Sequence, residues 1–309
     1  NKKLIFGNLV EKLRYGENPH QKGAIYSSSK KLKIRKLNGK QLSYNNFNDI
    51  FSALLISKSL PTNTGTAIIK HTNPCGVSIH KNKVESYRLA LKCDPISAFG
   101  GVLISNREID SVTAVLIHDL FCEVVIAPSF ESDALEILRG KKNRILLERQ
   151  PTKLPSSTVR TALNGYLVQE KDGSMESQSD LTCVTNNSSD NSAISDMLFA
   201  MKIAKHTKSN TIVFAKNNQL LASGTGQTSR VDALKQAVEK ANNLGLSLEG
   251  AVMASDAFFP FPDCVTLASE AGIKHVIQPG GSINDSKSID ACNELGLAMY
   301  TTGVRHFRH

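Results

Sequence analysis

Short apolar runs alternate with amphipathic segments along most of this 309-residue chain. In the first half, the runs at 102–105, 124–127 and 145–147 have the length of buried strands, and patterns with helical spacing separate them. Helices and strands that alternate in this way are typical of an α/β fold with largely parallel strands. In such sheets ligands bind at the loops beyond the strand ends, so we expect the functional residues there.

The alternating pattern occurs twice. Residues 123–128 (Glu-Val-Val-Ile-Ala-Pro) precede a helical pattern at 133–138, and residues 274–279 (Lys-His-Val-Ile-Gln-Pro) precede one at 290–295. A strand pattern follows each of these helical patterns. The match lies in pattern more than in identity, and it predicts a duplicated α/β unit.

A change of composition separates the two copies. Between Lys171 and Asn191 the chain is rich in Asp, Gly, Ser, Gln and Asn, which is typical of a connection between domains. We therefore expect a first domain at residues 1–170, a connection at 171–191 and a second domain at 192–309.

Composition limits the protein class. With 40% apolar residues the chain can bury a full core. No run is long enough to span a membrane, and Asn1–Phe6 lacks the layout of a signal peptide. The six cysteines are scattered without a Cys-x-x-Cys pair, which predicts buried, reduced thiols. We expect a soluble cytoplasmic protein, a fragment that lacks an N-terminal part, with no membrane partner.

The formal net charge of +9 has two interpretations. Nucleic-acid binding is disfavoured because the basic residues are dispersed and are not interleaved with aromatic residues. A positive field that attracts small anions such as phosphates or carboxylates is favoured. The dense basic run Lys30–Lys36 alternates with Leu32 and Ile34, which predicts an edge strand with a solvated face.

The stretch from Ile68 to Gly76 (Ile-Ile-Lys-His-Thr-Asn-Pro-Cys-Gly) is the strongest candidate site. A strand delivers Lys70 and His71 to its end, and Asn73-Pro74 is expected to turn the backbone out of the strand. Burial and neighbouring charges readily move lysine and histidine pKa values toward neutrality, so the pair suits proton transfer in both directions. A solvated Lys-His pair at a strand end is the alternative.

Other segments offer anion or ring contacts. Arg14 presents a planar fork for phosphate in a polar loop, and Tyr15 presents a hydroxyl group. The turn from Gly224 lacks the third glycine of a dinucleotide loop, but it ends in an Arg230 that we expect to be exposed to an anion.

Two aromatic segments remain open to two interpretations. The aromatic run from Phe258 to Asp263 either grips a flat ligand or caps the core. The basic residues from Arg305 to His309 either form a frayed tail or an anion site.

Six motifs, in this order along the whole chain, resemble the AICAR transformylase family, the C-terminal half of a bifunctional purine-biosynthesis enzyme. The motifs are Leu13–Gln21, Lys70–Gly76, Asp94–Gly101, Lys208–Asn210, Ser255–Phe261 and Arg305–His309. The resemblance implies formyl transfer from the co-substrate 10-formyltetrahydrofolate to the 5-amino group of AICAR, giving FAICAR. It also implies two cytidine-deaminase-like three-layer units without zinc, and a homodimer with shared active sites. An IMP cyclohydrolase domain is expected in the full-length protein.

The resemblance also implies site residues. The catalytic residues would be Lys70 and His71 for proton transfer and Asn210 for orienting the formyl group. The nucleotide-binding residues would be Arg14, Tyr15, Asn46, Gly100, Glu123, Arg230, Asp263, Arg305 and Phe307. The folate-binding residues would be Ile96, Val231, Phe258, Pro260, Ser282 and Ile283.

Two other functions compete with formyl transfer. A zinc deaminase requires His-x-Glu and Pro-Cys-x-x-Cys, but Asn73 and Ser78 stand at the decisive positions, so we expect no metal. A metal-free nucleotide-binding module without catalysis would keep Arg14 and Arg305 and would not need Lys70, His71 and Asn210 together.

Overall fold

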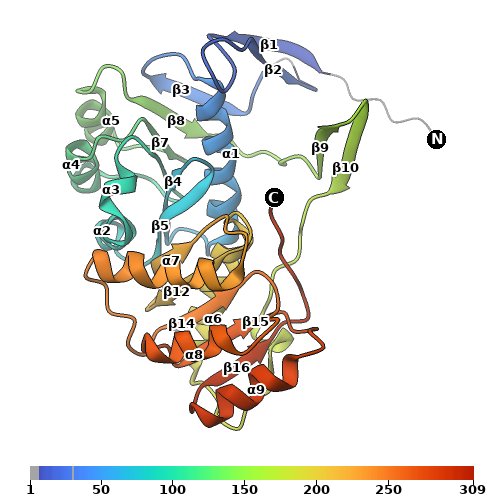
Figure 1. Ribbon diagram of the computed structural model, residues 1–309. Coiled ribbons are helices and arrows are strands. Elements are labelled where there is room, and N and C mark those ends of the chain that lie inside the picture. The colour runs from blue at the N-terminus through green and yellow to red at the C-terminus, as the bar shows by residue number, and fades with distance from the viewer. Residues whose placement is uncertain (1–6, 30) are drawn as a thin grey trace.

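A twelve-stranded sheet runs through the whole molecule in the computed structural model (Figure 1), which describes residues 7–29 and 31–309. The signal-peptide argument on Asn1–Phe6 and the Lys30 end of the basic run lie outside the described residues. The strand order is β11-β16-β15-β14-β12-β13-β5-β4-β6-β7-β8-β3. No helix in the described part of the chain combines the length and apolar character needed to cross a membrane.

Two units make up this sheet, and their elements follow in the same order except that α3 of the first unit has no counterpart in the second. The first unit contains α1 (Tyr44–Ser59), β4 (Gly65–Lys70), β5 (Asn73–Ile79), α2 (Lys83–Cys93), α3 (Pro95–Ala98), β6 (Val102–Ser105), α4 (Ser111–Asp119), β7 (Val124–Ala127), α5 (Ser132–Arg139) and β8 (Ile145–Arg149). The second contains α6 (Asn191–Lys205), β12 (Ile212–Lys216), β13 (Gln219–Gly224), α7 (Arg230–Asn243), β14 (Val252–Ser255), α8 (Asp263–Glu270), β15 (His275–Gln278), α9 (Asp285–Glu294) and β16 (Ala298–Thr301).

The remaining strands lie at the edges of the sheet or outside it. Strands β3 (Ile34–Asn38) and β11 (Thr182–Cys183) each add antiparallel to the last strand of one unit, which confirms the predicted edge strand near Ile34. The hairpins β1 (Asn8–Leu13)–β2 (Gly23–Ser27) and β9 (Ser157–Ala162)–β10 (Gly165–Glu170) form separate two-stranded sheets, and η1 (Gln178–Asp180) is a single turn.

The duplication is visible in the strand order. From the centre outward, β5-β4-β6-β7-β8-β3 in the first unit matches β13-β12-β14-β15-β16-β11 in the second. In each unit the innermost strands form an antiparallel hairpin and the next strands run parallel. The predicted α/β fold with a duplicated unit is therefore confirmed. The expectation of largely parallel strands was wrong: only β6-β7-β8 and β14-β15-β16 run parallel among the described strands, and the other pairings of the sheet are antiparallel because hairpin strands and edge strands make them. The domain boundaries remain a prediction.

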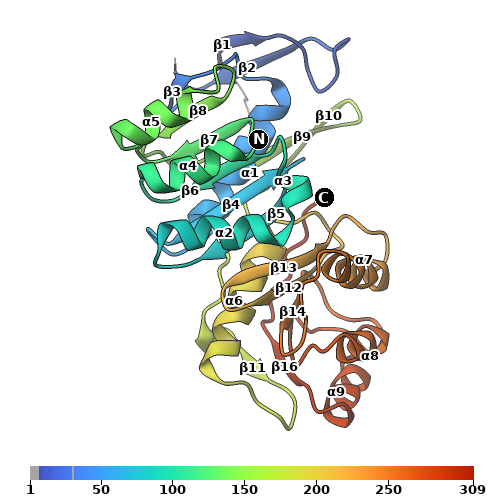
Figure 2. The same ribbon diagram turned by 90° about the vertical axis from the view of Figure 1, so that its left-hand side faces the viewer.

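Helices cover both faces of the sheet, giving three layers (Figure 2). Helices α1 and α6 share one face and a continuous core, whereas α2, α4 and α5 cover the other face in the first unit and α7, α8 and α9 in the second. Successive strand residues point to opposite faces, so Ile69 packs under α1 and its neighbour Ile68 packs in the opposite core.

The backbone does not leave the sheet after Lys70-His71, contrary to the prediction. Only His71 and Thr72 separate β4 from β5, and Pro74 lies inside β5, opposite Ile69. A register shift between Ile68 and Ile69 accommodates the proline, which cannot donate a ladder hydrogen bond. The prediction that Asn73-Pro74 ends the strand pairing was wrong.

Two further details were not foreseen. Five cysteines are buried as expected, but Cys183 is exposed. The β9–β10 hairpin, called the arm below (Ser157–Glu170), was not predicted because its strands lack a buried face. The arm projects from the body near the C-terminus (Figure 1).

The polar connection is fastened to the C-terminal tail through His306. This side chain is 1% exposed, its Nδ1 lies 2.5 Å from Asp172 Oδ2, and its Nε2 contacts Glu176 Oε1. Lys205 of α6 lies 3.2 Å from Asp172 Oδ1. Burial lowers the pKa of His306, but the hydrogen bonds and charges of Glu176 and Asp172 outweigh burial and raise it above the ordinary value. The two carboxylates therefore favour the charged form of the histidine.

The close packing of β5 against α2 can be tested by a substitution at Gly76. A Cβ at this position would lie 2.1 Å from the backbone oxygen of Ala90. Gly76→Ala should therefore reduce the free energy of unfolding by about 1–3 kcal/mol, measured by urea denaturation. Gly173→Ala, at a position where a Cβ meets nothing closer than 3.9 Å, should change it by less than about 0.5 kcal/mol. Equal effects would contradict this packing.

The His306 cluster predicts a pH dependence of stability. Because the folded pKa of His306 is raised, its contribution is full below the unfolded value of 6.5 and is lost as the pH rises through the folded value. The difference in unfolding free energy between wild type and His306→Gln should be larger at pH 6 than at pH 9. A difference that stays constant or grows with pH would show that His306 is not held charged.

Candidate active site

The turn between β4 and β5 presents the His71 side chain to solvent in a strained backbone. His71 and Thr72 have φ values of 49° and 65°. Each non-glycine residue in this left-handed region costs about 1–2 kcal/mol, and a β-branched residue there is an outlier. The Thr72 N–H donates to Asp49 Oδ1 of α1 at 2.6 Å. Helix α1 thus holds the turn in place.

Lys70, at the end of β4, lies directly beside the predicted residue Gly100. Its Nζ donates to the Phe99 backbone oxygen at 2.5 Å, and a Cβ on Gly100 would lie 3.1 Å from that Nζ. Gly100 has φ 71°, so a side chain there would be strained as well as crowded. The exposed rings of Phe99 and Phe121 stack at 4.9 Å beside this lysine.

The second unit repeats the lysine arrangement. Lys216, at the end of β12, donates from Nζ to Glu249 O at 2.6 Å, and a Cβ on Gly250 would lie 3.3 Å from that Nζ. The Lys–carbonyl–Gly contact therefore belongs to the repeated unit and is not special to the Lys70 end.

The hairpin turn is repeated too, with different residues. Asn217 and Asn218 have φ values of 54° and 56° at the equivalent turn, and both N–H groups donate to Asp196 of α6. Asp49 and Asp196 are each the sixth residue of their helix. Asparagine adopts this conformation at little cost, so the strained His71-Thr72 pair is what distinguishes the first unit.

The carboxamide of Asn210 is fixed by three hydrogen bonds. Its Nδ2 donates to Gln227 O at 3.1 Å and Thr228 O at 3.2 Å, and its Oδ1 accepts from Arg230 Nη2 at 2.8 Å. Both amide hydrogens are used, so the free capacity of this side chain is a lone pair on Oδ1.

Arg230 is not the exposed anion contact that was expected. It is 8% exposed, and its Nη1 lies 2.5 Å from Asp256 Oδ1 and 2.9 Å from Ser255 Oγ. The expectation failed because folding brings the end of β14 against the first turn of α7. Its guanidinium group orients Asn210 instead.

The loop that carries Asn210 meets the His71 turn within one chain. The Lys208 N–H donates to Asn73 Oδ1 at 2.9 Å. This contact follows from the antiparallel pairing of β5 with β13, which sets the turn of each hairpin beside the open end of the other. The structure therefore brings the two predicted catalytic segments together.

One face of α1 connects three predicted site segments. Asn45 Nδ2 donates to Glu17 O at 3.1 Å in the loop that carries Arg14 and Tyr15. Asp49 holds the His71 turn, and Ser52 Oγ accepts from Arg308 Nη2 of the C-terminal tail at 3.0 Å. Residues spaced by four and three positions lie on one helix face.

Sequence reasoning missed Asp49 and Arg308 as candidate functional residues. An alignment of the two repeats from their first helices would have paired Asp49 with Asp196. Arg308 lies in the C-terminal motif that had been noted, but no local pattern distinguishes it from Arg305.

The other predicted nucleotide-binding residues differ in the partners that their side chains have within the chain. Arg14 lies 5.5 Å from the centre of the Tyr15 ring, and Arg305 lies 4.4 Å from the centre of the Phe307 ring. Three residues have local partners: Asn46 Oδ1 accepts from the Ser43 N–H at 3.0 Å, Glu123 pairs with Lys40 at 2.6 Å, and Asp263 Oδ1 accepts from the Cys264 N–H at 2.8 Å.

Most predicted folate residues lie on two joined loops in the second unit. Asn284 Nδ2 donates to Pro260 O at 3.1 Å, which ties the Phe258–Pro260 loop to the Ser282–Ile283 loop. Phe259 is fully buried, which confirms the core interpretation for that ring. Phe258 and Phe261 are exposed, and their contact with a flat ligand stays a prediction. Val231 is half-buried on α7, and Ile96 lies 78% exposed on α3 of the first unit.

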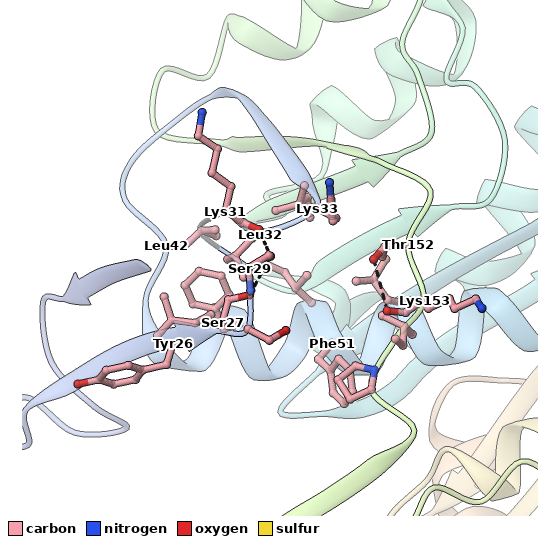
Figure 3. Close-up of a pocket in the computed structure, with 18 residues that line it drawn as sticks. Tyr26, Ser27, Ser29, Lys31, Leu32, Lys33, Leu42, Phe51, Thr152 and Lys153 are labelled. Atoms are coloured by element: carbon pink, nitrogen blue, oxygen red, sulfur yellow. Dashed lines mark hydrogen bonds between the residues drawn. The ribbon is translucent and has the colours of Figure 1, made fainter. Parts of the chain in front are cut away.

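A cavity of about 600 Å³ lies elsewhere, between α1 and the segments around β2 and β3 (Figure 3). Its lining is mainly apolar, and the amino groups of Lys31 and Lys153 point away from the apolar side chains. The residues that line it include none of the predicted site residues. We therefore place the candidate site at the His71 turn.

No group of three or more His, Cys, Asp or Glu side chains among residues 7–29 and 31–309 is arranged to hold a metal ion.

Comparisons with known proteins identify the family of the chain. The family model of the AICARFT/IMPCHase bienzyme matches residues 2–240. The bifunctional purine biosynthesis protein PurH of Bacteroides thetaiotaomicron is 53% identical over 302 residues, covering 98% of this chain and 59% of the relative. PurH of Acetivibrio thermocellus is 47% identical over 309 residues, covering 97% of this chain and 59% of the relative.

The chain thus spans about three fifths of the length of these relatives. A solved dCMP deaminase from the cyanophage S-TIM5 matches 35% of this chain and 94% of its own, at 20% identity. Its TM-score of 0.27 is too low to support a structural conclusion. The family model and the sequence relatives suffice: the chain belongs to the AICARFT/IMPCHase bienzyme family.

Proposed function

We propose that this chain transfers a formyl group from 10-formyltetrahydrofolate to the 5-amino group of AICAR, giving FAICAR and tetrahydrofolate. The observation that carries the proposal is an exposed His71 with Lys70 beside it at one strand end, together with the fixed carboxamide of Asn210, in a chain of this family. We assign the chain to the C-terminal, formyl-transferring part of the bienzyme. We assign the IMP cyclohydrolase activity to a separate domain of the full-length protein. The scattered free cysteines support a cytoplasmic location.

The residues suit each step of the transfer. The amine of AICAR is a weak nucleophile, so His71 accepts its proton as the nitrogen forms a bond to the formyl carbon. Lys70 donates a proton to N10 of the folate as the bond between that nitrogen and the formyl carbon breaks. The contact with Phe99 O uses one of the three N–H groups of Lys70 and leaves two for this role.

The fixed carboxamide of Asn210 suits orientation of the reactants. Its remaining Oδ1 lone pair can accept an N–H of the attacking amine, while its Nδ2 hydrogens stay on Gln227 and Thr228. This refines the role expected from the sequence, because the formyl group is then oriented through its attacking partner.

Three exposed side chains suit the two substrates. Arg14 and Arg305 are exposed and rest on aromatic rings, which leaves their guanidinium groups for the phosphate. Phe258 offers an exposed ring to the pterin. The other nucleotide and folate residues keep the roles expected from the family, with Arg230 acting through Asn210.

The proton-transfer roles predict a large loss of turnover in two variants. Lys70→Ala and His71→Ala should each lower kcat for formyl transfer by about 100-fold or more and leave AICAR binding largely intact. Lys216→Ala removes the equivalent lysine of the second unit, which makes the same backbone contact, and should keep kcat near wild type.

The measurements are formyl transfer by the purified chain and AICAR titration by calorimetry. Normal turnover in either His71→Ala or Lys70→Ala would remove that residue from the mechanism. A wild-type chain that binds AICAR without transferring a formyl group would instead be a nucleotide-binding module.

We also propose a homodimer with active sites shared between its subunits, as the family resemblance implies. The arm supports a dimer because it exposes Leu163, Tyr166 and Leu167, and a two-stranded hairpin is marginal in water without a partner. Arg160 of the arm contacts the backbone oxygen of His309, so a subunit seated on the arm would lie beside the tail that carries Arg305.

Mixing two inactive variants tests the sharing. Dimers of Lys70→Ala with Asn210→Ala chains would carry one site with both defects and one with neither. Equal amounts under exchange conditions should therefore restore about a quarter of wild-type activity by random pairing. Leu167→Glu in both chains should weaken the dimer and abolish the recovery.

The contact between Asn73 and Lys208 within one chain offers the competing arrangement. If labelled subunits are shown to exchange and no activity returns, Lys70 and Asn210 act in the same chain's site.

A further inference from the structure

Arg308 joins the two units at the His71 turn. Its Nη1 donates to Thr72 O at 3.1 Å and contacts His206 O, and its Nη2 donates to Ser52 Oγ at 3.0 Å. Its backbone N–H donates to Ser209 Oγ, and its backbone oxygen accepts from the Ser209 N–H, both at 2.9 Å. One residue thus holds α1, the turn, the end of α6 and the Asn210 loop.

The repeated unit shows what this turn requires. In the second unit the Asn218 carbonyl accepts from the Ile79 N–H at 2.9 Å, and Asp196 accepts the turn's N–H groups. In the first unit Asp49 accepts the Thr72 N–H, and the guanidinium of Arg308 takes the place of the backbone donor. The contacts of Asp49 and Arg308 with Thr72 are called the clamp below. The first turn depends on its contacts more than the second does, because His71 and Thr72 do not favour the left-handed region and asparagine tolerates it.

We propose that Arg308, together with Asp49, is a positioning residue for His71. Asp49 holds the peptide N–H of Thr72 and Arg308 holds its carbonyl oxygen, and together they keep the imidazole in its catalytic place. The clamp itself stands on the geometry of the turn, and its effect on turnover rests on the proposed function. Arginine suits this task because its planar guanidinium donates from separate nitrogens in fixed directions, whereas a lysine donates from a single nitrogen.

The first arm of the test measures turnover. Arg308→Ala should lower kcat by about 10-fold to 100-fold at saturating substrates with a smaller change in KM, since a misplacement of about 1 Å has that effect. Arg88→Ala, which removes an exposed arginine paired only with Glu85, should leave kcat unchanged.

The second arm is a rescue based on the repeated unit. Thr72→Asn introduces the residue type that occupies the equivalent Asn218 position and relieves the backbone strain. In the Arg308→Ala background it should recover a large part of the lost kcat. A general disruption of the tail would not be repaired by a substitution in the turn.

The third arm measures the turn without any substrate. Backbone amide hydrogen exchange across residues 70–80 should be faster in Arg308→Ala than in wild type and slower again in the double variant. If the wild type transfers no formyl group, the proposed function fails, and the exchange rates still decide whether Arg308 holds the turn. Unchanged exchange and turnover in Arg308→Ala, or a double variant no better than the single one, would overturn the proposal.

Discussion

The antiparallel pairing of β5 with β13 is the constraint on which the candidate site depends. This pairing, with Gln219 opposite Ser78, joins two units that would otherwise be separate sheets. Because the two inner hairpins run antiparallel, the turn of each lies beside the open end of the other. His71 therefore meets the loop of Asn210, and Asn218 meets the end of β5 at Ile79.

Two nearly equivalent ends result, and among the described residues they differ in a few side chains. Both ends keep a lysine on a backbone oxygen, a glycine beside it and an aspartate under the turn. The first end differs by an exposed histidine, a strained threonine and a C-terminal tail that reaches it through Arg308. The comparison within one chain separates the residues that build the unit from those for which we propose a role in chemistry.

Buried charge fixes the polar side of the site. The pair of Arg230 and Asp256 is almost fully desolvated, and it gains from further hydrogen bonds to Ser255 and Ser209. Removing either partner would leave an uncompensated charge beside Asn210. Arg230, which the sequence predicted to be an exposed anion contact, is thus buried and orients Asn210.

The His306 cluster works on the same principle farther along the tail. Two carboxylates from the connection face its ring, so the polar segment between the units is tied to the end of the chain. Alternate tail residues then point outward, which leaves Arg305 and Phe307 exposed next to the buried His306. Order in the tail comes from contacts with distant segments, because the tail itself has no regular hydrogen bonding.

The sequence by itself determined the α/β class, the duplicated unit, most helices and strands, and the Lys70-His71 pair at a strand end. These features depend on apolar periodicity and on neighbours a few residues away, which a sequence displays directly. Tertiary structure alone decided that Arg230 is buried, that Asn73-Pro74 continues as a strand, and that Asp49 and Arg308 hold the His71 turn. Arg308 and Thr72 are 236 positions apart, and no local pattern records a contact that only the pairing of two folded units creates.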